Sequence, residues 1–254
     1  MSHPDDPKTL AQRAESVLLW AIGIAWLMLG TTPITLLSRW LSTERLDPWT
    51  RLYTRSQVAV TTARWRAVVD PAVDPDQTYL FCQNHVNILD YCTMYPSTPH
   101  VKQGIELESH FKIPFYGWFM KGRGTIGINR DDPRALVKLI RACKAEVAKG
   151  RSLLMFPEGT RTRTGRVAAF ETGAVHIARQ LGLPIVPVAV LGMHEVQPTG
   201  SWRFRAFQEV VVEVMAPIPT AGLAREDVEA LSARVRDQIA ARVDAWYAER
   251  GETR

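Results

Sequence analysis

The sequence predicts an α/β protein with a mainly parallel central sheet flanked by helices, preceded by an N-terminal two-helix membrane anchor. From Thr78 onward, short apolar runs alternate with segments whose apolar residues recur at helical spacing. Strands that alternate with helices are typical of a parallel sheet covered on both faces. Ahead of this region lies an uncharged apolar stretch. We therefore divide the chain into a membrane-associating helical segment, residues 1–70, and an α/β domain, residues 71–254.

The uncharged stretch covers Val17–Leu37, which as one helix would measure about 30 Å, the thickness of a bilayer's hydrocarbon core. Pro33 interrupts it, and the continuously apolar part, Val17–Leu29, would measure only about 20 Å. We therefore favour a kinked or embedded helix over a clean transmembrane span. A cleaved signal peptide is not expected, because acidic residues precede the apolar run and no small-residue cleavage pattern follows it.

The segment Asp47–Arg66 is predicted to form an amphipathic helix, with Trp49 and Leu52 on an apolar face and arginines elsewhere. Six arginines and two acidic residues lie between Arg39 and Arg66, and such a basic stretch beside an apolar one suits an anionic membrane surface. The alternatives are a solvated basic helix, or two helices that simply pack on the domain.

The α/β region is predicted element by element from its apolar runs and its helix start and stop signals. The expected strands cover 79–82, 100–104, 125–128, 152–156, 185–190 and 210–215, and the expected helices cover 133–149, 172–181 and 226–250.

Composition excludes several classes of protein. The hydrophobic share of 46% and the charged share of 22% match a folded globular protein. The three cysteines form no CxxC or Cys/His cluster, which fits a reducing compartment and argues against a zinc site. The formal charge is +5, but no basic helix with interleaved aromatic residues or known nucleic-acid module is present, so we expect no nucleic-acid partner.

The first chemically suggestive motif runs from Asn84 to Asp90, directly after the strand predicted at 79–82. In one ideal helix, side chains five residues apart point about 140° away from each other, so His85 and Asp90 can meet only across a turn. A carboxylate that holds an imidazole fixes its tautomer, and the imidazole can then accept a proton from a hydroxyl. Taken alone, a loop histidine with an unrelated aspartate explains the motif almost as well.

The second motif, Phe156–Thr162, follows the strand predicted at 152–156. Its proline and glycine expose backbone amides, and arginines follow at 161, 163 and 166, a composition suited to phosphate recognition. A solvated turn with surface arginines is the alternative. Arg130, at the end of the strand predicted at 125–128, can supply a second phosphate-binding charge. The glycines of Gly122–Gly127 precede a strand rather than follow one, which argues against a dinucleotide site.

Taken in order, these motifs resemble those of the glycerolipid acyltransferase family, of which the 1-acylglycerol-3-phosphate acyltransferases are typical. His85 and Asp90 match the family's H-x-x-x-x-D block, and Gly127–Arg130 matches its second block. Phe156–Arg161 reproduces the sequence FPEGTR, and Ile185–Ala189 matches the apolar fourth block. The resemblance covers residues 78–192. The chain departs from the usual pattern after His85, where Val86 and Asn87 stand, and in the second block, where Gly127 replaces a bulky residue and Asn129 an acid.

The resemblance implies a phospholipid-synthesising O-acyltransferase that converts lysophosphatidate to phosphatidate. His85 would take the proton of the acceptor hydroxyl while Asp90 holds the imidazole, and Arg130 and Arg161 would bind the acceptor phosphate. Amides near Gly159 and Thr160 are candidates for the oxyanion site, and Glu158 would position the arginine or the backbone. Acyl-CoA or acyl-acyl carrier protein would be the co-substrate, with no metal or other cofactor.

The implied partners are membrane lipids and the acyl donor, at the cytoplasmic face of the cell membrane. Two alternatives stay open. The acceptor can be another lyso-acceptor, either a lysophospholipid with a larger headgroup or a lyso-amino-acid lipid, or the protein can be a membrane lipid-binding protein of the same fold without catalysis.

Overall fold

A computed structural model describes residues 3–251 of the chain. The elements are, in chain order, α1 Leu10–Leu37, α2 Thr43–Ala59, β1 Arg64–Val69, β2 Leu80–Gln83, α3 Asp90–Met94, η1 Tyr95–Ser97, β3 Lys102–Leu107, η2 Glu108–Lys112, α4 Tyr116–Arg123, β4 Ile126–Ile128, α5 Ala135–Val147, β5 Ser152–Met155, α6 Gly173–Leu181, β6 Ile185–Leu191, α7 Met193–Val196, β7 Glu209–Val214 and α8 Val228–Glu249.

The described strands form one seven-stranded sheet in the order β1-β7-β6-β2-β5-β3-β4. Every neighbouring pair is parallel except β6 and β7, which are antiparallel. The predicted α/β class, with a mainly parallel sheet flanked by helices, is therefore confirmed. Because β2, β5, β3 and β4 are parallel neighbours, the segments that follow them meet at one edge of the sheet, where sites in such folds collect.

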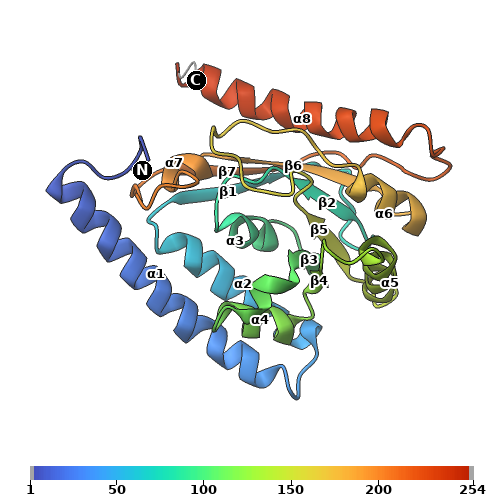
Figure 1. Cartoon of the computed structure of the whole chain (residues 1–254), viewed down its shortest axis with the longest axis horizontal. Coiled ribbons are helices and arrows are strands. Elements are labelled where there is room, and N and C mark those ends of the chain that lie inside the picture. The colour runs from blue at the N-terminus through green and yellow to red at the C-terminus, as the bar shows by residue number, and fades with distance from the viewer. Residues whose placement is uncertain (1–2, 252–254) are drawn as a thin grey trace.

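Helices cover both faces of the sheet, as Figure 1 shows: α8 lies over one face, and α1 to α4 lie on the other side. The central strand β2 is buried on both faces, and its successive side chains join different cores. Phe81 packs into the core that includes Leu19 of α1, whereas Leu80 and Cys82 pack into the core that includes the inner residues of α8.

The helix α1 is 28 residues long, or about 42 Å, and continues through Pro33. It is long and apolar enough to cross a membrane. Its first turns, however, are tied to the loop before β7. Trp20 Nε1 donates to the carbonyl of Trp202 at 2.7 Å, and the Phe204 N–H donates to Ser16 Oγ at 3.1 Å.

The far end of α1 is held by the same domain. There Ser38 and Thr35 pack so closely on α4 that a side chain at Gly122 would lie 2.6 Å from Ser38 Oγ. The helix therefore lies along the domain, attached at both ends, instead of leaving it. Its outer side is apolar and exposed, through Val17, Leu18, Ile22, Ile24, Trp26, Leu29, Leu36 and Leu37.

The helix predicted over 47–66 is wrong in its last seven residues. The helix α2 ends at Ala59, and residues 64–69 form β1, which pairs with β7 from Arg64↔Glu209 to Val69↔Val214. Neither face of this edge strand is fully buried. Arg64 and Arg66 are therefore exposed, as they would be on the surface of a helix, and the sequence pattern did not separate the two structures. The sheet thus begins before residue 70, where we placed the domain boundary.

The arginines of α2 are not all available to a membrane surface. Arg51 is half-buried and donates to Asp47 and to the backbone carbonyls of Thr98, Pro99 and His100. Trp49 and Leu52 are exposed, as predicted for the apolar face. A membrane anchor made of both helices therefore stays a prediction, with α1 supplying most of the exposed apolar surface.

Candidate active site

The turn that carries His85 begins after Asn84. At this residue the side chain, instead of the backbone, forms the hydrogen bonds to β6. Asn84 Nδ2 donates to the Val190 carbonyl at 3.0 Å, and the Val190 N–H donates to Asn84 Oδ1 at 2.7 Å. The side chain thereby continues the ladder between β2 and β6 after the last backbone pair, Gln83↔Val188. The backbone is free to leave the sheet at His85, and α3 begins at Asp90.

His85 and Asp90 meet across this turn, as their spacing required. Nδ1 of His85 lies 2.8 Å from Oδ2 of Asp90, which also accepts the backbone N–H groups of Val86 at 2.7 Å and Asn87 at 2.9 Å. Asp90 is fully buried, whereas the His85 side chain is 24% exposed. An ionised carboxylate can only accept hydrogen bonds, so the proton of the neutral imidazole sits on Nδ1. Nε2 is then left with a lone pair.

The second motif lies beside the first because β5 is the neighbour of β2 in the sheet. The ring of Phe156 stacks on the imidazole of His85, with centroids 4.2 Å apart and planes 21° apart. The Thr162 N–H donates to the His85 carbonyl at 2.8 Å. Residues 156–162 therefore hold both the ring and the backbone of His85.

Glu158 connects the two motifs through its carboxylate. Oε1 accepts the His85 N–H at 2.8 Å, and Oε2 accepts the Ala168 N–H at 2.9 Å. Burial raises the pKa of Glu158 above its ordinary value, against the opposite influence of these two backbone donors. Both oxygens are used within the protein, so Glu158 holds the backbone, the second of the two roles expected from the sequence.

Gly159 stands at the centre of the turn with φ +68°, a conformation that favours glycine. Its carbonyl accepts a bond from Arg130 Nη2 at 3.0 Å, which brings Arg130 to the second motif. Its own N–H donates to the Phe156 carbonyl at 3.0 Å. The Gly159 amide is therefore occupied, and an oxyanion would have to use another amide of this turn, for example that of Thr160.

A cavity of about 660 Å³ opens beside His85, within the range of ligand sites. Two kinds of side chain line it. The polar ones are His85, Glu106, His110, Arg130, Thr160, Arg161 and Glu171. The apolar ones are Ile105, Leu107, Ile128, Ala135, Leu136, Leu139, Met155, Phe156, Pro157, Ala174 and Ile177. The predicted residues His85, Arg130, Gly159, Thr160 and Arg161 all line this cavity, whereas the Asp90 and Glu158 side chains lie behind its wall.

Sequence reasoning missed a second histidine–carboxylate pair in this cavity. Nδ1 of His110 lies 2.7 Å from Oε1 of Glu106, and the Tyr116 hydroxyl donates to the other oxygen at 3.2 Å. The only signal in the sequence was the position of Glu106 near the end of a predicted strand. It also missed the buried amides of Asn84 and Asn87, whose Nδ2 groups donate to carbonyls 106 or more residues away in the chain.

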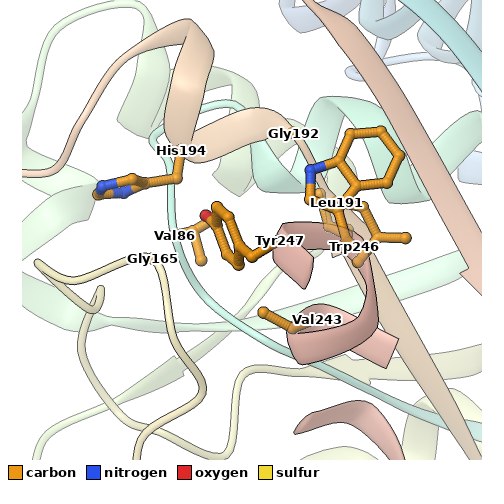
Figure 2. Close-up of a pocket in the computed structure, with 9 residues that line it drawn as sticks. Val86, Gly165, Leu191, Gly192, His194, Val243, Trp246 and Tyr247 are labelled. Carbon is orange, nitrogen blue, oxygen red and sulfur yellow. The ribbon is translucent and has the colours of Figure 1, made fainter. Parts of the chain in front are cut away.

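A separate, much smaller cavity of about 10 Å³ lies behind the turn from Asn84 to Asp90, with room for about one water molecule. Figure 2 shows Tyr247 and Trp246 of α8 and His194 of α7 around it, with Val86 of the turn at its wall. α7 and α8 therefore support the turn from the side opposite to the larger cavity.

Comparison with known proteins gives consistent matches. The model of the family described as Acyltransferase matches residues 66–191. The chloroplastic 1-acyl-sn-glycerol-3-phosphate acyltransferase of Brassica napus is 36% identical over 143 residues, which are 56% of this chain and 41% of that protein. The 1-acyl-sn-glycerol-3-phosphate acyltransferase of Saccharomyces cerevisiae is 30% identical over 166 residues, 63% of this chain and 54% of that protein. The chain thus spans about half the length of these relatives or less.

A solved structure supports the fold. The crystal structure of the 1-acyl-sn-glycerophosphate acyltransferase from Thermotoga maritima aligns with a TM-score of 0.78 and 19% sequence identity. The alignment covers 93% of this chain and 96% of that one.

Proposed function

We propose that this chain, which belongs to the acyltransferase family through residues 66–191, moves a fatty acyl group from a thioester to the free hydroxyl of a lysophospholipid. The acceptor we favour is 1-acylglycerol-3-phosphate, which would give phosphatidate, because the matched relatives carry that activity in their names. The observation that carries the proposal is the buried carboxylate of Asp90, 2.8 Å from His85 Nδ1 at the wall of a cavity that also presents arginines.

In this mechanism His85 is the general base. Asp90 holds Nδ1, so Nε2 accepts the proton of the acceptor hydroxyl while its oxygen attacks the thioester carbonyl carbon. The tetrahedral intermediate collapses with breakage of the carbon–sulfur bond, and the proton on Nε2 passes to the leaving thiolate. Asp90 stabilises the imidazolium that exists between these two steps. Amides of the Glu158–Arg161 turn other than that of Gly159 would stabilise the oxyanion.

The lining of the cavity suits the two ends of such substrates. The guanidinium groups of Arg130 and Arg161 would bind the acceptor phosphate through charge-assisted hydrogen bonds. The apolar side chains from α5, α6 and the neighbouring strands would accept a fatty acyl chain. The donor is acyl-CoA or acyl-acyl carrier protein, and the reaction needs no metal or further cofactor.

The partners we propose are this acyl donor and the membrane lipids. Because α1 is attached to the domain at both ends and exposes its apolar side, we propose that it lies in the membrane surface rather than crossing the bilayer. We place the protein at the cytoplasmic face of the cell membrane, where acyl donors are available and where its three free cysteines stay reduced.

A second acceptor class is favoured by one specific observation, the Glu106–His110 pair in the cavity. In its neutral form His110 carries its proton on Nδ1 toward Glu106, so Nε2 can accept a hydrogen bond from a hydroxyl or ammonium group. Lysophosphatidate has no such group beyond its phosphate and the reacting hydroxyl. A lysolipid whose larger headgroup carries a hydroxyl or an N–H-bearing ammonium group would have one, and so would one with a free amino group on an amino acid.

The test uses the purified full chain in vesicles, a labelled acyl-CoA or acyl-acyl carrier protein, and a panel of lysolipids, with products separated by thin-layer chromatography. We expect labelled phosphatidate from lysophosphatidate with the wild type and none with His85→Ala. Faster acylation of another lysolipid would select the second acceptor class. Folded protein that acylates no acceptor from either donor would overturn the enzyme proposal in favour of a lipid-binding role.

A further inference from the structure

Asn87 lies inside the turn from Asn84 to Asp90, here called the catalytic turn, and has no role in the mechanism above. Its side chain is completely buried. Nδ2 donates to the carbonyls of Met193 at 2.8 Å and Gln197 at 3.0 Å, and Oδ1 accepts the Leu89 N–H at 2.8 Å. Both donor hydrogens and the acceptor of this amide are therefore engaged, and the two donated bonds reach residues more than 100 positions away in the chain.

The backbone of the same residue acts on the catalytic pair. The Asn87 N–H donates to Asp90 Oδ2 at 2.9 Å, next to the bond from His85 Nδ1 at 2.8 Å. If the turn rotated, this N–H and that of Val86 would move away from the carboxylate, and the direction of the imidazole would change with them. The position of Asn87 therefore determines the position of Asp90 relative to His85.

The partner of Asn87 is a fixed part of the fold. Met193 is fully buried in the core, and the residue before it, Gly192, packs so closely on β7 that a side chain would lie 2.0 Å from the Glu209 carbonyl oxygen. After α7, Thr199 Oγ1 donates to the Val86 carbonyl at 2.8 Å. The segment 193–199 thus contacts the catalytic turn at two adjacent residues from one side.

We propose that Asn87 is a positioning residue that sets the orientation of His85 and Asp90 by fixing their turn to α7, a role that rests on the proposed acyl transfer. An asparagine is required because two carbonyls and one N–H face it. An aspartate would place a carboxylate oxygen against the two carbonyls, and a serine is too short to reach both.

The proposal makes a prediction for kinetics. Asn87→Ala should lower kcat by about 10- to 100-fold, because a small displacement of a catalytic group has effects of this size. The KM values for acceptor and donor should stay within about threefold of the wild type, since Asn87 touches neither substrate in the proposed arrangement. Asn87→Ser, which keeps an acceptor for the Leu89 N–H but cannot reach both carbonyls, should not restore the wild-type kcat.

A second readout does not depend on turnover. In the ¹⁵N-histidine NMR spectrum of the full chain in micelles, the signal of His85 can be assigned by its loss in His85→Asn, because the chain has only six histidines. We expect the titration midpoint of His85 to move in Asn87→Ala. Thr220→Val is the matched control, because Thr220 is buried and donates to the Leu183 carbonyl far from the turn. It should leave both kcat and the His85 titration unchanged.

The outcomes separate the two proposals. Wild-type protein without acyl transfer contradicts the proposed function, but the NMR titration still tests the role of Asn87. An unchanged His85 titration and an unchanged kcat per folded molecule in Asn87→Ala would show that Asn87 is merely structural. If that variant does not fold, Thr199→Val, which removes a single bond to the same turn, must move the titration for the proposal to stand.

Discussion

The backbone N–H of His85 donates to Glu158 Oε1 at 2.8 Å, and this one bond joins two motifs that are 73 residues apart in the chain. The other oxygen of the carboxylate holds Ala168. Glu158 therefore fixes the start of the catalytic turn and the loop that follows the second motif at the same time. Loss of either bond should change the position of His85, although Glu158 is not expected to touch a substrate.

Glu158→Ala removes the acceptor of two partly buried N–H groups, those of His85 and Ala168. Each lost hydrogen bond costs about 0.5–1.5 kcal/mol of unfolding free energy, so urea unfolding should show a measurable loss. We also expect kcat to fall more than tenfold, because the backbone of His85 is released. A variant with wild-type stability and turnover would show that water replaces the carboxylate and that the connection has no function.

The pH dependence of stability provides a second test of Glu158. Because burial raises its pKa, the folded protein binds the proton of this carboxyl more tightly than the unfolded chain does, and ionisation costs stability. The unfolding free energy of the wild type, relative to Glu158→Gln, should therefore fall as the pH rises above about 4.5, the value for an unperturbed glutamate. A difference that rises with pH instead would mean that the two backbone donors outweigh burial.

His85→Ala should abolish acyl transfer while the protein stays folded by circular dichroism. General-base catalysis is typically worth about 10²- to 10⁴-fold, and Asp90→Asn should approach the same loss because the charge that stabilises the imidazolium disappears. His176→Ala is the matched control, since His176 lies on α6 and does not line the cavity. More than about a tenth of wild-type turnover in both variants would exclude the pair from catalysis.

Arg161→Ala should weaken the use of lysophosphatidate by about 10- to 100-fold in kcat/KM, the effect of losing a hydrogen bond to a charged group. Arg161→Lys should recover only part, because the forked geometry of the guanidinium is lost. Arg163→Ala is the control, as an exposed arginine outside the cavity. If the Arg161 and Arg163 variants behave alike, the acceptor phosphate binds elsewhere.

Membrane binding should depend on the outer side of α1. Leu18→Glu with Leu29→Glu places two charges on residues that are 59% and 68% exposed, and should shift the protein from vesicles to the soluble fraction in flotation assays. Val137→Glu, at a 70% exposed residue of α5, should leave binding unchanged. Wild-type protein that leaves the vesicles in high salt would show that charge alone holds it there.

These substitutions test the anchor better than a truncation. Deletion of residues 1–66 would remove the first half of β1 together with Leu19 and Val58, and would uncover the core against which these two side chains pack. The domain left behind should unfold or aggregate. The loss of membrane binding would then have no single cause.

The sequence predicted most of the sheet and the turn at His85, because buried parallel strands are continuous apolar runs and the motifs follow them directly. It failed at β1, where Arg64 and Arg66 alternate with apolar residues on an exposed edge strand. It also missed α4, an eight-residue helix that is too short to show a clear period.

What the sequence could not provide were contacts between distant segments. The partners of Asn87 are carbonyl groups of residues 193 and 197, and backbone carbonyls have no signature in a sequence. The same holds for Arg51, whose spacing suited a membrane surface but whose guanidinium binds the carbonyls of residues 98–100. Glu106 and His110 are close in the chain, but their pairing depends on the conformation of η2, which no local sequence pattern predicted.

The attachment of α1 at both of its ends has a consequence for lipid traffic. A protein whose apolar helix returns to its own domain can enter only the leaflet that it faces. In the proposed reaction, lysolipid would be taken from that monolayer and the two-chain product returned to it. Growth of the opposite monolayer would then require separate transbilayer movement of the product, because the acylating protein reaches only one side.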